Sequence, residues 1–84
     1  MVTVKLFGTL RLDTGVKKFT ADAHSARELP PLLMKEILRR QPDTALTERD
    51  LRSCLIAVNG TLTGPHTRLR DGDLVCLFPA AAGG

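Results

Sequence analysis

The clearest hydrophobic pattern is a strict alternation of apolar and polar residues at the start of the chain. A period of two is typical of a strand with one buried face, so we expect Val2, Val4 and Leu6 to point into a core. Phe7 then falls on the opposite face, which normally contacts water. The sequence therefore predicts an N-terminal strand whose outer face carries one aromatic residue.

A second strand is expected shortly afterwards. Asp13, Thr14 and Gly15 form a turn signal, and residues 16–20 are again strand-like, with Phe19 expected to face the core. Together with the first strand they predict a β-hairpin.

Helical periodicity follows. Ser25 and Glu28 fit a capping box, but Pro30 and Pro31 come directly after it, so we expect at most one turn at residues 25–29. The main helix should begin at Pro31, where a missing N–H costs nothing, and end before Pro42. Four residues form its apolar stripe: Leu33, Met34, Ile37 and Leu38.

The second half of the chain reads as strands and turns. A short turn capped by Thr47 precedes an apolar strand at residues 54–58, and Asn59-Gly60 is the strongest hairpin signal in the chain. Further strands are expected at residues 61–63 and 74–78.

This order of elements predicts the fold class. If the first and last strands pair in parallel, the helix forms the crossover that such a pairing requires. The prediction is an α+β fold of β-grasp (ubiquitin-like) type, a mixed sheet packed on one main helix. We expect residues 1–79 to form this domain and residues 80–84 a flexible C-terminal tail.

Composition excludes several classes of function. The net charge is only +3 and the three aromatic residues are all Phe, so stacking platforms for nucleic acid are lacking and no nucleic-acid partner is expected. Cys54 and Cys76 lie far apart and fit free thiols rather than a metal site. His24 and His66 have no neighbouring nucleophile, so a catalytic triad is not supported. Without a membrane-length apolar run or a signal-peptide pattern, a cytoplasmic protein with no membrane partner is expected.

The last residues carry a distinctive chemistry. Gly83 and Gly84 follow Ala80, Ala81 and Ala82, and a carboxylate preceded by residues without side chains can enter a narrow channel. The reactive group would then be the carboxylate of Gly84 itself. The alternative is that small residues simply fray at a terminus.

The last strand suggests a docking surface. If Val75 and Leu77 point inwards, then Leu74, Cys76 and Phe78 point outwards and, beside Phe7, form an apolar patch on the outer face of the sheet. Such patches usually bind partner proteins, and aromatic residues are favoured anchors. The alternative is that the tail or a loop covers the patch.

The chain resembles the ubiquitin-like sulfur-carrier proteins of the MoaD/ThiS family, and within it the small subunits of molybdopterin synthase. The resemblance runs from end to end and is carried by these segments: Val4-Lys5-Leu6-Phe7-Gly8, Ile56-Ala57-Val58-Asn59-Gly60, Leu69-Arg70-Asp71-Gly72-Asp73-Leu74-Val75, Leu77-Phe78-Pro79 and Ala82-Gly83-Gly84.

The resemblance implies a chemistry in which the partners supply the catalytic groups and this chain binds no cofactor. An E1-like activating enzyme would use ATP to adenylate Gly84, and a cysteine desulfurase or rhodanese-like donor would supply sulfur to form a thiocarboxylate. In the molybdopterin synthase large subunit, the tail would give this sulfur to cyclic pyranopterin monophosphate. Pro79 to Ala82 would contact the partners, and Arg11 matches a basic position frequent in the family.

Three alternatives stay open at this point. The chain could serve the thiamine pathway as a sulfur carrier, although the Phe78-Pro79 ending argues against that branch. It could be a protein modifier joined to target lysines through Gly84, or a binding module with an inert tail. The fold alone does not choose among them.

Overall fold

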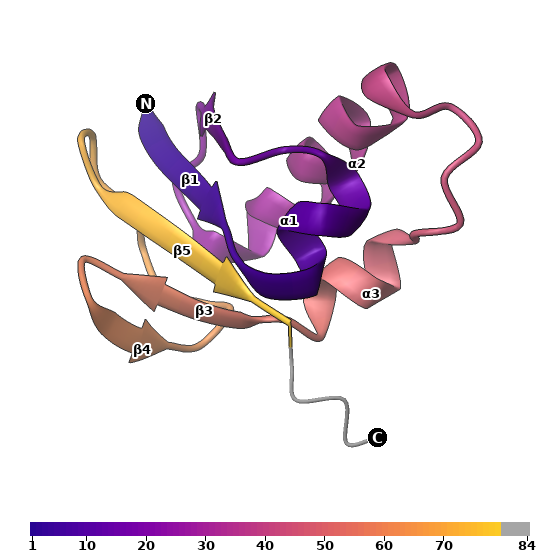
Figure 1. Cartoon of the computed structure of the whole chain (residues 1–84). Helices are drawn as coiled ribbons and strands as arrows, with labels where there is room; N and C mark the ends of the chain where they lie inside the picture. The colour runs from indigo at the N-terminus through magenta and orange to yellow at the C-terminus, as the bar shows by residue number, and fades with distance from the viewer. Residues whose placement is uncertain (80–84) are drawn as a thin grey trace.

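A five-stranded mixed sheet with helices packed on one face forms the described part of the protein (Figure 1). The computed structural model describes residues 1–79, so the predicted tail, residues 80–84, lies outside the described residues and the domain boundary before it stays a prediction. In chain order the elements are β1 (Val2–Leu6), α1 (Gly8–Thr14), β2 (Lys18–Ala21), the short 3₁₀ helix η1 (Ala26–Glu28), α2 (Leu29–Arg40), α3 (Glu48–Arg52), β3 (Leu55–Val58), β4 (Thr61–Thr63) and β5 (Leu74–Phe78).

The strand order is β2-β1-β5-β3-β4, with β1 and β5 side by side in the middle of the sheet. These two strands are parallel, whereas β2 pairs with β1, and β3 with β4 and β5, in antiparallel fashion. The connection between the two parallel strands contains α2, as a parallel pairing requires. The predicted β-grasp fold is therefore confirmed.

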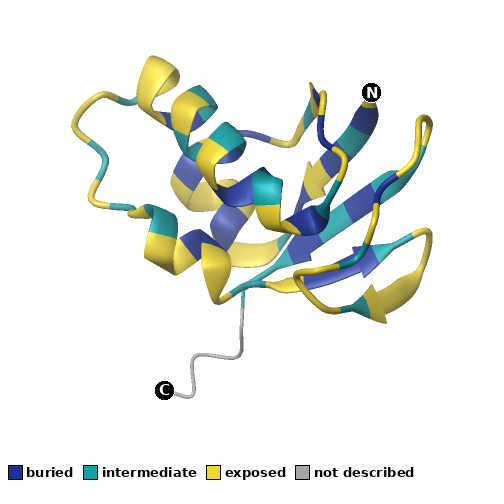
Figure 2. Ribbon diagram, turned by 180° about the vertical axis from the view of Figure 1, so that it is seen from behind, coloured by how far each residue is buried: buried dark blue, intermediate teal, exposed yellow. Residues whose placement is uncertain are grey.

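The core lies between the sheet and the helices. Val2, Val4 and Leu6 are at most 1% exposed, which confirms the inward face predicted from their alternation. All three α-helices bury a leucine in the same core cluster, so they share one side of the sheet. Figure 2 shows the buried positions as dark blue bands on the strands and on the inner faces of the helices. Among residues 1–79 no helix has the length and apolar run needed to cross a membrane.

The buried stripe of α2 is narrower than predicted. Leu29, Leu33 and Ile37 are fully buried at intervals of four residues. Leu38, which we expected in this stripe, is 44% exposed. One residue beyond Ile37 turns the helix by about 100°, which carries Leu38 away from the sheet.

Helix α2 also starts earlier than predicted, at Leu29 instead of Pro31. The first backbone N–H groups of a helix have no intrahelical partner, so both prolines fit into its first turn without losing a hydrogen bond. The predicted capping box is altered as well. The Ser25 hydroxyl accepts from the N–H of Arg27, but the Glu28 carboxylate accepts from the N–H of His24 rather than from Ser25.

The first hairpin contains a helix that the sequence patterns did not predict. Strands β1 and β2 are antiparallel as expected, and the connection between them includes the two turns of α1. Its C-terminal end is the predicted turn, where Gly15 adopts a left-handed conformation with φ of 71°. Within this turn the buried Thr14 hydroxyl donates to Leu10 O and accepts from the N–H of Val16.

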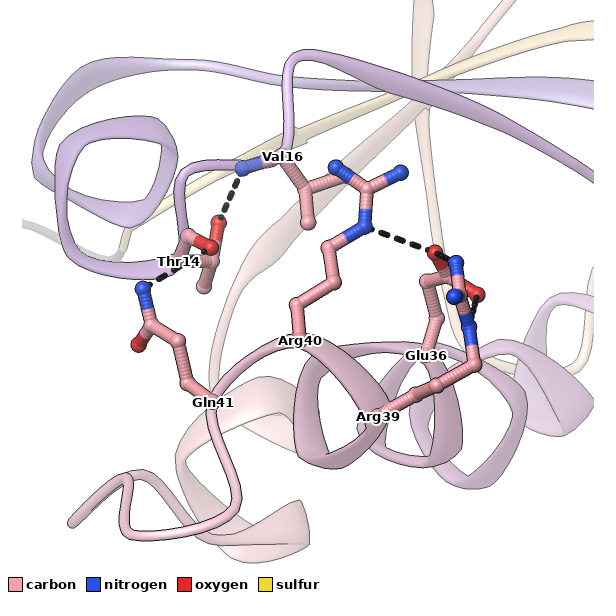
Figure 3. A network of polar contacts seen from close by, with 6 residues as sticks. All are labelled: Thr14, Val16, Glu36, Arg39, Arg40 and Gln41. Carbon is pink, nitrogen blue, oxygen red and sulfur yellow. Dashed lines mark hydrogen bonds and ion pairs between the residues drawn. The ribbon is translucent and has the colours of Figure 1, made fainter.

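Polar contacts join α1 to the end of α2 (Figure 3). The Gln41 side-chain amide donates to Thr14 O at 3.3 Å. On the preceding turn, Arg39 and Arg40 both bind the Glu36 carboxylate at 2.7 Å. Hydrogen bonds from these two arginines lower the pKa of Glu36 to about 2. The last turn of α2 thus carries cations near its negative dipole end, as expected.

This ion-pair cluster gives a testable pH dependence. The folded-state pKa of Glu36, about 2, lies below its ordinary value of 4.5, so its stabilising effect is complete above the ordinary value and is lost as the pH falls through about 2. Glu36→Gln should therefore lower the free energy of unfolding at neutral pH and make progressively less difference in acid. Urea denaturation of both proteins across this range measures the effect, and a pH-independent difference would contradict it.

The predicted elements of the second half are confirmed, except that the strand expected at residues 54–58 begins one residue later, at Leu55. Thr47 caps α3 in a complete capping box with Asp50. Asn59 and Gly60 form the turn between β3 and β4, with positive φ values of 50° and 88°, as the mirror-image hairpin turns require.

Two residues of the segments that carried the family resemblance have a clear structural role. The Asn59 side chain accepts from the N–H of Leu74 and donates to the Asp73 carboxylate, both at 3.0 Å. Asp73 also accepts from the N–H of Arg70 at 2.8 Å, and these hydrogen bonds lower its pKa. The turn after β3 is thereby tied to the start of β5.

Candidate functional site

The exposed side of β5 has the predicted alternation. Val75 and Leu77 are at most 2% exposed and belong to the core. Leu74, Cys76 and Phe78 alternate with them and are half-buried on the opposite face. Their outward direction is confirmed, while their role in docking stays a prediction.

Phe7 lies beside the end of β5, as expected. Its backbone N–H donates to Leu77 O at 3.1 Å, which continues the pairing of β1 with β5 by one residue. Its ring stacks on that of Phe78 with a centroid separation of 4.9 Å and an interplanar angle of 17°. The two rings form a stacked aromatic pair at the end of the sheet that precedes Pro79.

The patch extends further than the sequence reasoning predicted. Leu55 pairs with Phe78, and Ala57 pairs with both Cys76 and Leu62, so these residues share the outer face. Leu55 is 50% and Leu62 66% exposed. We call this surface the outer patch, and it consists of Phe7, Leu55, Ala57, Leu62, Leu74, Cys76 and Phe78, of which Ala57 is only 8% exposed.

The two missed leucines could have been found from the sequence. A two-residue Asn-Gly hairpin fixes the register of its strands, so Ala57 must face Leu62 across the turn. Leu55 then follows on the same face, two residues before Ala57.

Pro79 is the last described residue, and the start of α1 packs against it. A Cβ added to Gly8 would lie 3.2 Å from Pro79 Cγ, and Gly8 has a positive φ of 62°. Pro79 itself is half-buried. The other predicted tail residues, Ala80 to Ala82, Gly83 and Gly84, lie outside the described residues.

Any side chain at position 8 is therefore expected to destabilise the fold. Gly8→Ala should lower the free energy of unfolding by about 1–2 kcal/mol, because an L-residue in the left-handed region costs about that much. Gly64→Ala is the matched control, since its added Cβ meets no atom within 4 Å. Urea denaturation compares the two variants, and equal stability would contradict the requirement for glycine.

A cavity of about 630 Å³ lies beside Pro79, between α1, the loop after α2 and the end of α3. Three of its lining residues are carboxylates, Asp13, Asp43 and Asp50, which would repel an anion such as a C-terminal carboxylate. Cys54 also lines it, and burial, with a contribution from Asp50, raises the pKa of its thiol. A protonated thiol is a poor nucleophile, so Cys54 is not poised to react in this cavity.

Arg11 is exposed on α1 and lines a groove of about 320 Å³ that Phe7 also lines. The groove contains three further cations, Lys5, Lys17 and Lys18. The described part of the chain holds no group of three or more His, Cys, Asp or Glu side chains able to bind a metal ion. The four cations and the apolar outer patch thus meet at Phe7, next to the end of β5.

Comparisons with known proteins agree with this architecture. A chain of the complex between subunits 1 and 2 of molybdopterin-converting factor from Helicobacter pylori is 30% identical, with a TM-score of 0.62 over 99% of this chain and 97% of that chain. A chain of the BexX/CysO complex from Amycolatopsis orientalis is 26% identical, with a TM-score of 0.61 over the whole of both chains. SAMP1 from Haloferax volcanii shares the fold with a TM-score of 0.65, at 21% identity over 99% and 98% of the two chains.

A search of curated protein sequences gave no match. The family comparison, however, covers nearly the whole sequence, because the model of the ThiS family matches residues 4–84. That span takes in nearly all of the five strands and extends through both terminal glycines. With its β-grasp sheet and its half-exposed apolar outer face, the chain belongs to the ThiS family of ubiquitin-like sulfur carriers.

Proposed function

We propose that this protein is the sulfur-carrier subunit of a molybdopterin synthase and that the carboxylate of Gly84 carries the sulfur. The observation that carries the proposal is continuity between two features. The outer patch ends at Phe78, one residue before Pro79, and the tail follows directly. A partner seated on the patch would therefore receive the tail close to its own active site.

The chemistry follows from the weakness of a carboxylate as an electrophile. An E1-like enzyme first transfers AMP from ATP to Gly84, which supplies a good leaving group. The terminal sulfur of a persulfide on a cysteine desulfurase or rhodanese-like donor then attacks the acyl carbon, and the bond to AMP breaks. A second thiol of the donor system attacks the other sulfur of the acyl disulfide so formed, and this breaks the S–S bond, releases the thiocarboxylate and leaves a disulfide on the donor. The resulting thiocarboxylate delivers sulfur to cyclic pyranopterin monophosphate, bound in the large subunit.

In this proposal the chain is a substrate-like subunit rather than an enzyme. Its own contribution is to dock and to present the acyl end, which requires rigidity at the base of the tail and small residues beyond it. The Phe7–Phe78 stack and the contact between Gly8 and Pro79 support the first requirement. The sequence Ala80 to Gly84 supports the second.

The two relatives known as complexes support docking of a partner subunit. One is a complex of both subunits of molybdopterin-converting factor, and the other joins BexX to CysO. The molybdopterin branch is preferred because the former is the more similar in sequence of the two.

Intact-mass spectrometry tests the proposal. The protein is incubated with ATP, an activating enzyme and a sulfur donor, and a gain of about 16 Da, one sulfur in place of one oxygen, is expected. Adding the large subunit and cyclic pyranopterin monophosphate should then return the original mass. No gain with an activating enzyme that modifies another ThiS-family protein would refute the proposal, and conjugates to other proteins would favour a protein modifier.

A further inference from the structure

The groove beside Phe7 gathers positive charge in a way that the outer patch does not explain. Four cations line it: Lys5, Arg11, Lys17 and Lys18. No carboxylate lines it, and none of the four forms an ion pair with another residue in the range 1–79. By contrast, Arg40 and Arg52 are each paired with a glutamate on their own helix.

Two of these cations face each other directly across the sheet. Lys5 on β1 is the register partner of Lys18 on β2, and both are exposed on the outer face. The N–H of Leu6 donates to Lys17 O at 3.0 Å, so the adjacent pair, Lys5–Lys18, is of the non-hydrogen-bonded kind, in which side chains are closer. Like charges in this position destabilise a sheet.

The groove is also continuous with the outer patch. Phe7 belongs to both, because its ring stacks on Phe78 and its side chain lines the groove. Cys76 pairs with Lys5, so the lysine row begins next to the apolar row on β5. A protein seated on the patch would therefore lie next to this groove.

We propose that the partner that docks on the outer patch, the large subunit, inserts an acidic segment into this groove, so that Lys5 and Lys18 guide it into place. This inference rests on the proposed function in assuming that the large subunit binds the patch. Carboxylates of the partner would reduce the electrostatic repulsion between the two lysines. The free protein is destabilised by this repulsion and the complex would not be, so its removal favours binding. Complementary charge at the edge of an interface mainly raises the association rate and is screened by salt.

Lys18→Glu tests the proposal because it should act in opposite directions on folding and on binding. In the free protein the introduced carboxylate would pair with Lys5, so the melting temperature should rise by about 1–5 °C. The association rate constant with the purified large subunit should fall by about fivefold or more at low salt, and the difference should shrink at high salt. Stopped-flow or surface plasmon resonance measures the rate.

Lys35→Glu is the matched control, because Lys35 is exposed on α2, on the helical side of the sheet, and the change in net charge is the same. Its association rate should stay within about twofold of the wild type. If the wild type binds and Lys18→Glu associates no more slowly than the control, the acidic-segment proposal fails while the docking function stands. If the wild type gains sulfur but does not bind the large subunit, both the docking and this inference fail. The acidic-segment proposal would also be overturned if the protein bound a single-stranded oligonucleotide more tightly than the large subunit, because the four cations would then serve to bind nucleic acid.

Discussion

Deleting Gly84 is expected to abolish sulfur transfer and leave folding unchanged. The deletion shortens the tail by up to about 3.5 Å, and a displacement of about 1 Å from the reacting geometry can cost about a hundredfold in rate. Among residues 1–79 every buried core residue lies within residues 2–77, so the described core loses nothing. The wild type and the variant are compared by intact mass after activation and by molybdopterin formation, with thermal unfolding as the check on folding.

Two further variants separate length from shape. Deleting Ala81 keeps both terminal glycines but shortens the tail as much as deleting Gly84 does. If the length of the tail limits the reaction, this variant should also be activated poorly. Gly84→Ala keeps the length of the tail and adds one Cβ. It should therefore lose sulfur transfer only if the partner's channel is too narrow for a side chain at the last residue. Full sulfur transfer by the chain that lacks Gly84 would refute the assignment of its carboxylate as the reactive group.

The fold could be predicted from the sequence where one physical signal dominated. The alternation of apolar and polar residues correctly predicted which side chains of β1 and β5 face the core. The Asn59-Gly60 turn correctly predicted the hairpin of β3 and β4. Helix α1 was missed because its seven residues bury only Leu10 and Thr14 and expose Leu12, which gives no helical stripe. The start of α2 was placed two residues late because proline was allowed only at the first helical position.

Only the part of the candidate site that lies on strongly alternating strands could be predicted from the sequence. Leu74, Cys76 and Phe78 followed from alternation on one strand, and Phe7 from the strand beside it. Leu55 and Leu62 belong to strands whose register had to be worked out across a turn, and short strands give a weak periodic signal. The pairing of Lys5 with Lys18 depends on the length of the α1 connection, so it was accessible only from the structure.

The second large effect is expected at Phe78, where the outer patch ends beside Pro79. Phe78→Asp should weaken binding of the large subunit by about thirtyfold or more, because buried aromatic anchors commonly contribute about 2 kcal/mol or more to an interface. Folding should suffer less. Phe78 is half-buried on the outer face, so the free protein loses mainly its stack with Phe7, about 0.5–1.5 kcal/mol.

Leu12→Asp provides the matched control, since Leu12 is 80% exposed on α1 and lies outside the outer patch. Both variants replace an accessible apolar side chain by the same carboxylate, so a general effect of charge on solubility or folding appears in both. Calorimetry with the large subunit should show near-normal affinity for Leu12→Asp and strongly reduced affinity for Phe78→Asp. Equal affinities would mean that the outer patch is not where the partner binds, because an interface that covers the Phe7–Phe78 stack cannot accept an unpaired carboxylate there without loss.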